Sequence, residues 1–128
     1  MRTIFRNASN RVLLKLRDDP AALADAVLLF RQNGRPVLTK GKEALSVRPG
    51  TDSRGQPFWE LSAELSPAEA ALFDGRGLVF AQLAVLRESG RQDCGEIVEF
   101  DVCDTAAEIR FDPPRGKAWK NESWRAET

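Results

Sequence analysis

The most constraining feature of this 128-residue chain is a strict two-residue alternation of apolar and polar side chains from residue 59 to residue 65. The apolar set falls on one face and consists of Trp59, Leu61, Ala63 and Leu65. Helical periodicity would spread these side chains around an axis, so the alternation predicts a strand with one buried face. A fold built on such strands must cover each of them on at least one side.

Further strands are expected over residues 12–17, 26–32, 35–39, 45–48, 78–86 and 96–102. In the last of these, Val98, Phe100 and Val102 face inward, while Glu99 and Asp101 face outward. Residues 78–86 are almost wholly apolar, which predicts a central strand covered on both faces. Polar residues 88–93 form the turn that joins these two strands as a hairpin.

The segment Ala21–Gln32 carries two conflicting signals. Asp19 as N-cap, Pro20 at the first helical position and several alanines favour a helix start. The dipeptide Asn33–Gly34 between apolar runs favours a hairpin, because both residue types tolerate positive φ. We give the hairpin more weight and expect a strand from about Ala26 to Gln32.

Turn and cap signals complete the prediction of fold class. Residues 49–55 are rich in turn formers and predict a loop. Ser66, Pro67 and Glu69 form a capping box that starts a short helix ending near Phe73. Short strands with one short helix indicate a mainly β protein, an immunoglobulin-like antiparallel β-sandwich. We assign residues 1–111 to this domain and residues 112–128 to a polar C-terminal tail.

Composition argues against several functions. Lysine plus arginine and aspartate plus glutamate each number 19, so no net charge attracts nucleic acid or an anionic membrane. Without histidine, the chain lacks the commonest general base and zinc ligand. Cys94 and Cys103 are nine residues apart, which is not a metal-binding spacing, and on one strand would stay free thiols. We expect no enzyme activity, cofactor or metal, and, since neither a signal peptide nor a membrane span is evident, synthesis in the cytoplasm.

Three sequence features together carry a family resemblance. They are residues 22–37 with their Asn-Gly turn, the strand-to-helix step at residues 65–69, and the pairing expected between residues 79–83 and 97–102. The order resembles small β-sandwich proteins of phages and prophages, in particular the N-terminal domain of the phage baseplate upper protein. The resemblance spans about Val12 to Val102. It implies a virion structural or assembly protein, baseplate or tail in type, that forms homo-oligomers or binds other virion proteins.

Acidic and aromatic residues provide the remaining site candidates. Glu96, Glu99, Asp101 and Asp104 could suggest acid-base chemistry or calcium binding, but acids on an outward strand face normally serve solubility. Trp59 is expected in the core. The candidate interface residues lie in the tail, where tryptophan and arginine are typical anchors: Trp119, Trp124 and Arg125.

Self-association is expected through sheet edges and the tail, because edge strands carry unpaired backbone groups and zero net charge gives no mutual repulsion. The alternative function is a carbohydrate- or peptide-binding sandwich module, since the same fold hosts such sites. A carbohydrate site would place a tryptophan on an exposed face. A buried Trp59 would therefore count against it.

Overall fold

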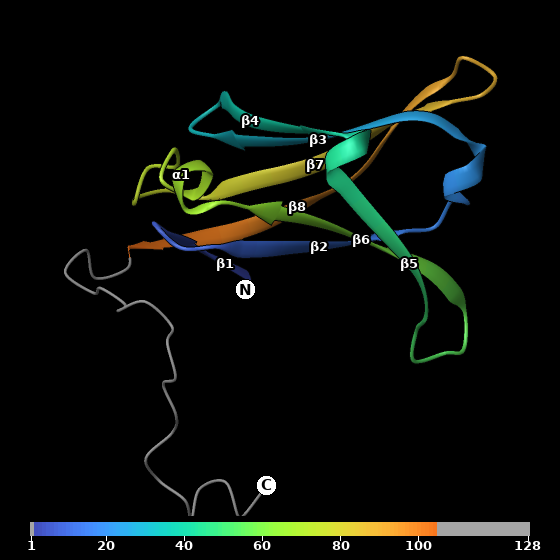
Figure 1. Ribbon diagram of the computed structural model, residues 1–128, viewed down its shortest axis with the longest axis horizontal. Helices are drawn as coiled ribbons and strands as arrows, with labels where there is room; N and C mark the ends of the chain where they lie inside the picture. Colours follow the sequence, from blue (N-terminus) through green and yellow to red (C-terminus); the bar gives the residue numbers. More distant parts are fainter. Residues whose placement is uncertain (1, 105–128) are drawn as a thin grey trace, which may run out of the picture.

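The computed structural model describes residues 2–104, which form two β-sheets packed face to face with one short helix at one end of the sandwich (Figure 1). The strands are β1 (Arg2–Arg6), β2 (Asn10–Leu16), β3 (Leu23–Gln32), β4 (Arg35–Gly41), β5 (Leu45–Thr51), β6 (Pro57–Leu65), β7 (Val79–Arg87) and β8 (Gln92–Asp104). The helix α1 spans Pro67–Ala70, and two single turns of 3-10 helix, η1 (Pro20–Ala22) and η2 (Lys42–Ala44), precede β3 and β5. The expected mainly β sandwich is confirmed.

The strand order is that of an immunoglobulin-like sandwich. One sheet has the order β1-β8-β7-β3-β4 and the other has the order β2-β6-β5. Strands β8, β7 and β3 thus stand where strands G, F and C of immunoglobulin domains stand, and β2, β6 and β5 match B, E and D. The pairing is antiparallel except between β1 and β8, which run parallel. The sequence analysis had missed β1 and this one parallel pair.

The core lies between the sheets. Val12 of β2, Leu61 of β6, Leu28 of β3 and Val79 of β7 are each at most 2% exposed. Phe30 and Phe73 meet edge to face, with ring centroids 5.9 Å apart. This aromatic pair joins β3 to the α1–β7 loop, and such a contact adds about 1 kcal/mol to the stability gained by burial alone.

The hairpin signal at Asn33–Gly34 is confirmed. Asn33 has φ +53° and Gly34 has φ +74°, as the expected two-residue turn requires. The strand before it begins at Leu23 rather than Ala26. The competing helix signal produces only η1, in which the Asp19 side chain accepts a hydrogen bond from the Ala21 amide.

Three further predicted boundaries are wrong. Residues 49–51, expected in a loop, belong to β5. Among the described strands β5 pairs with β6 and forms a sheet edge, where a proline is tolerated, and the ring of Phe58 occupies the space above Gly50. Residues 92 and 93, expected in a turn, already belong to β8. The helix was expected to reach Phe73 but ends at Ala70, and the chain continues in turns in which the amides of residues 72 and 73 donate to the carbonyls of residues 69 and 70. Its predicted capping box between Ser66 and Glu69 is present.

Candidate docking surfaces

The outer face of the three-stranded sheet carries ion pairs between neighbouring strands. Arg11 of β2 pairs with Glu64 of β6 at 2.8 Å, and Arg48 of β5 pairs with Glu60 of β6 at 2.7 Å. Both pairs bridge directly opposed residues on neighbouring strands. This face is therefore polar, with Leu13 as its one exposed large apolar residue within residues 2–104.

The outer face of the five-stranded sheet is different, because it is largely apolar. The register places Leu29, Gln82 and Ile97 in one row across β3, β7 and β8, and Val27 and Ala84 in the next. Phe80 lies opposite Arg31, in the row on the other side of Leu29 and Gln82. We call Val27, Leu29, Phe80, Ala84 and Ile97 the outer-face patch. Ile97 is 59% exposed and Phe80 and Val27 are each 36% exposed, and adjacent exposed apolar residues mark interaction surfaces.

Strand β7 accounts for much of this patch and corrects one prediction. Its apolar run had predicted a strand covered on both faces, and its position between β8 and β3 is indeed central. Yet only the face with Val79, Ala81, Leu83 and Val85 packs into the core. Within residues 2–104, Phe80 on the opposite face remains exposed. The prediction that β7 is covered on both faces is therefore wrong for the described residues.

Two charged residues flank the patch. Arg31 of β3, Phe80 of β7 and Glu99 of β8 occupy one row, with the aromatic ring in the middle. Both charged side chains are exposed, and neither forms an ion pair within the described part of the chain. The row thus reads positive, apolar, negative across the sheet.

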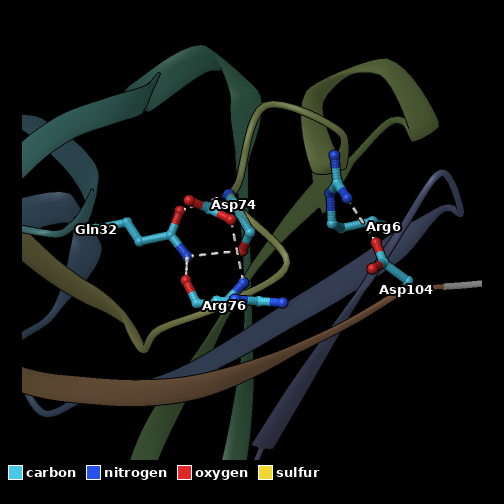
Figure 2. Close-up of polar contacts among 5 residues, drawn as sticks. All are labelled: Arg6, Gln32, Asp74, Arg76 and Asp104. Carbon is cyan, nitrogen blue, oxygen red and sulfur yellow. Dashed lines mark hydrogen bonds and ion pairs between the residues drawn. The ribbon is translucent and has the colours of Figure 1, made fainter.

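A buried amide fixes the loop between α1 and β7 (Figure 2). Gln32, at the end of β3, is 4% exposed and is the one buried polar side chain among the described residues. Its Nε2 donates to the Asp74 carbonyl at 2.8 Å, and its Oε1 accepts from the Asp74 amide at 2.6 Å. Longer contacts of 3.3 and 3.4 Å reach the carbonyls of Arg76 and Gly77. The Gln32 side chain therefore forms hydrogen bonds with backbone groups at three positions of this loop.

The same loop packs against the point where β8 ends. Arg6 of β1 pairs with Asp104 at 2.5 Å, as Figure 2 shows. A side chain at Gly75 would come within 2.9 Å of the Asp104 carboxylate, so the glycine allows the loop to approach this pair. The ion pair holds the last described residue of the chain beside β1.

The opposite end of the sandwich carries a second charged cluster. Arg87, at the end of β7, contacts Asp93 at 2.5 Å and Asp18 at 3.1 Å. The hydrogen bond to Asp93 raises the pKa of Arg87, with Asp18 adding to the effect, and the bond from Arg87 lowers the pKa of Asp93. The ion pairs of Arg87 with Asp18 and Asp93 tie the β2–β3 loop to the β7–β8 hairpin.

The acidic residues singled out in the sequence do not form a common site. Glu96, Glu99, Asp101 and Asp104 are strung along β8, all exposed, and Asp104 is paired with Arg6. Within residues 2–104 no group of three or more possible metal ligands comes together. Trp59 was expected in the core and is partly buried, packed against the core rather than within it.

Other predicted features can be placed only in part. Cys94 and Cys103 are both free and exposed on β8, in agreement with the sequence prediction. Trp119, Trp124 and Arg125 lie outside the described residues, as does the boundary expected at residue 111. The sequence analysis missed the outer-face patch, although the apolar side chains at Phe80 and Ile97 broke the alternation and were the available signal.

Comparison with known proteins adds little. No family model and no curated protein matches the chain. Among solved structures, the V domain of amphioxus IgVJ-C2 is similar at 14% identity and a TM-score of 0.31, over 77% of this chain and 96% of that domain. No helix within residues 2–104 is long and apolar enough to cross a membrane.

Proposed function

We propose that this chain is a non-catalytic assembly domain that docks on other protein chains, first of all on a second copy of itself, through the outer-face patch. The observation that carries the proposal is the contrast between the two sheets. One outer face is crossed by ion pairs, whereas the other exposes Phe80 on β7 and, in the neighbouring row, Ile97 on β8. Burying such apolar area stabilises a complex by about 25 cal/mol per Å².

Charge supports a second copy as the partner. Two copies can face each other across a twofold axis that runs parallel to the strands, between their two outer faces. Rotation about this axis leaves each cross-strand row at the same position along the strands and exchanges the two ends of the row. Arg31 of one copy then lies opposite Glu99 of the other, with the two Phe80 rings between them. The patch is therefore complementary to itself, as an isologous dimer requires.

The more specific role is that of a virion structural or assembly protein of the phage baseplate or tail type, with further virion proteins as partners. Its support is the resemblance of the strand and turn order. Such a protein would be cytoplasmic during synthesis and later part of the virion. Packing of Trp59 against the core counts against the carbohydrate-binding alternative.

The test compares matched glutamate substitutions on the two outer faces. Ile97→Glu should raise the dimer dissociation constant by at least about tenfold, because an unpaired charge would be buried in the contact. Leu13→Glu is the control, since Leu13 is 40% exposed on the polar face. Sedimentation velocity over a range of concentrations gives the constants, and unchanged melting temperatures show that both variants fold.

A charge exchange tests the twofold arrangement itself. Arg31→Glu should weaken the dimer roughly fivefold to thirtyfold, because two ion pairs become two like-charge contacts. Adding Glu99→Arg in the same chain should restore it. A wild-type chain that stays monomeric at high micromolar concentration would refute self-association, and equal losses in Ile97→Glu and Leu13→Glu would refute the patch.

A further inference from the structure

The seam between the two sheets is covered along only half of its length. On this side of the sandwich the seam runs between β2 and β8, and β1 pairs with β8 only from Phe100 to Asp104. The N label in Figure 1 accordingly lies part-way along the sandwich. Among residues 2–104, Gln92–Glu99 of β8 pair with β7 alone. They present about 26 Å of strand edge at 3.3 Å per residue.

Under this open half lies a groove of about 350 Å³ with an apolar floor and a charged rim. We call it the edge groove, and its lining includes Leu14, Leu16, Leu83, Val85, Cys94 and Val98. Charged side chains line it as well: Arg2, Lys15, Arg17, Asp18, Arg87, Asp93 and Glu96. The four buried leucine and valine residues of the lining keep 5–7% exposure. Beneath β1, by contrast, Val12, Val79 and Ala81 keep at most 1%, because Ile4 of β1 fills the seam at 0% exposure. Within residues 2–104, no side chain fills the open half of the seam as Ile4 fills the covered half.

A strand edge above a groove with an apolar floor binds an extended peptide with apolar side chains at alternate positions. This chain contains such a segment beyond the last described residue. Ala107, Ile109 and Phe111 alternate with Glu108 and Arg110, and prolines at 113 and 114 follow. Six residues, 106–111, span about 20 Å when extended and thus match the open edge.

The position of Asp104 decides which copy's groove this segment reaches. Asp104 is held by Arg6 at the covered half of β8. The open edge begins at Glu99, five residues or about 17 Å from Asp104 along the strand. Ala107 is only three residues beyond Asp104 and can lie at most about 10 Å from it, which is less than that distance. The segment therefore cannot lie along Gln92–Glu99 of its own chain, whereas a second copy can present that edge at any position.

We propose that residues 106–111 of one copy bind as an added β-strand along Gln92–Glu99 of another copy, with Ile109 in the edge groove. The contact joins two different surfaces, so it is heterologous and builds rings or open chains of copies. It shares only Ile97 with the outer-face patch, and it stands independently of the proposed function.

The native thiol of Cys94 reports this contact in the full-length chain. Cys94 lies opposite Ala84 of β7, so its side chain faces outward, as Arg110 would beside Ile109 in the added strand. In a Cys103→Ser, Arg110→Cys variant, the introduced thiol should form a disulfide with Cys94 under mild oxidation by oxidised glutathione, because bridged cysteines need Cα atoms about 4.4–6.8 Å apart. Mixing unlabelled and ¹⁵N-labelled chains before oxidation should give linked peptides of mixed isotope content by mass spectrometry. The control is Cys103→Ser with Lys120→Cys, which places the thiol beyond the two prolines.

Each outcome bears on the proposal. Mixed-isotope links in the Arg110→Cys variant at several times the control yield support it. Links within single chains, or equal yields in the two variants, overturn it. As a readout without cross-linking, Ile109→Glu should lower the mean mass by light scattering at unchanged melting temperature, and an unchanged mass overturns strand addition. Adding Phe80→Glu should leave the cross-link intact, because Phe80 lies on β7 and outside the edge Gln92–Glu99, and this separates the contact from the outer-face dimer.

Discussion

Replacing Gln32 by leucine tests whether one buried amide fixes the loop between α1 and β7. The substitution keeps the approximate volume but leaves the Asp74 amide and carbonyl without the partners they have at 2.6 and 2.8 Å. Each unsatisfied buried group costs about 1–3 kcal/mol, which gives roughly 2–6 kcal/mol for two groups. Burial of the leucine side chain offsets about 1.5–3 kcal/mol of this. The expected net loss is about 2 kcal/mol.

Urea unfolding followed by tryptophan fluorescence measures this loss, and the melting temperature should fall by roughly 8 °C. Gln82→Leu is the matched control, because the Gln82 amide donates to the Gly95 carbonyl at 2.9 Å in an exposed position where water replaces it. It should change stability by less than about 0.5 kcal/mol. A Gln32→Leu protein as stable as this control would refute the argument.

Gln32→Glu adds a dependence on pH to the same test. A carboxylate there accepts from the Asp74 amide but faces the Asp74 carbonyl without a proton to donate. Repulsion raises its pKa in the folded state, so its contribution to stability is present at acid pH and is lost as the pH rises. The deficit relative to wild type should be larger at pH 8 than at pH 4. A deficit that stays constant with pH would contradict the assigned contacts.

Three further predictions follow from local contacts. Phe73→Ala should cost about 3–5 kcal/mol in urea unfolding, because the ring is 1% exposed, and a loss below 1 kcal/mol would contradict its place in the core. The hydrogen bond from Lys40, with that from the Ser66 amide, lowers the pKa of Glu69 and gives stability that is lost as the pH falls through the folded-state pKa. Glu69→Gln should therefore reduce the difference in melting temperature between pH 7 and pH 3, and an unchanged difference would exclude this pairing. Cys94 and Cys103 should both react with a thiol reagent in the native state, and intact mass should show no disulfide.

The sequence predicted elements well where local chemistry decides them. The alternation at Trp59–Leu65, the turn at Asn33–Gly34 and the cap at Ser66 each act over a few residues, and each is found in the structure. Strand β1 was missed because it has five residues and a single fully buried side chain, Ile4. Its pairing with β8 joins residues almost a hundred positions apart, and no short window of sequence contains that information.

The candidate docking surface was harder to predict than the fold. Outward Glu99 and Asp101 suggested a solvated face, although the two-residue period that places them there also places Ile97 on that face. The two acids decided the interpretation of β8, and the apolar side chain two residues before Glu99 was not weighed. The register shift between β7 and β8 is a different matter, because the extra residue on β8 puts Cys94 rather than Gly95 opposite Ala84 and is not visible in a pattern of apolar and polar residues.

The two proposed contacts differ in symmetry, and assembly size can therefore separate them. A face-to-face contact through Phe80 is twofold and closes at a dimer, whereas strand addition at Gln92–Glu99 is head to tail and does not close at two copies unless both segments exchange. With both contacts present, dimers join into dihedral rings or branched chains. Ile109→Glu should limit the full-length protein to a dimer at any concentration, while Phe80→Glu on β7 should leave rings or chains whose mass grows by single copies. Light scattering coupled to gel filtration distinguishes these series, and a dimer limit in the Phe80→Glu protein would show that the exchange is reciprocal between two chains rather than sequential along many.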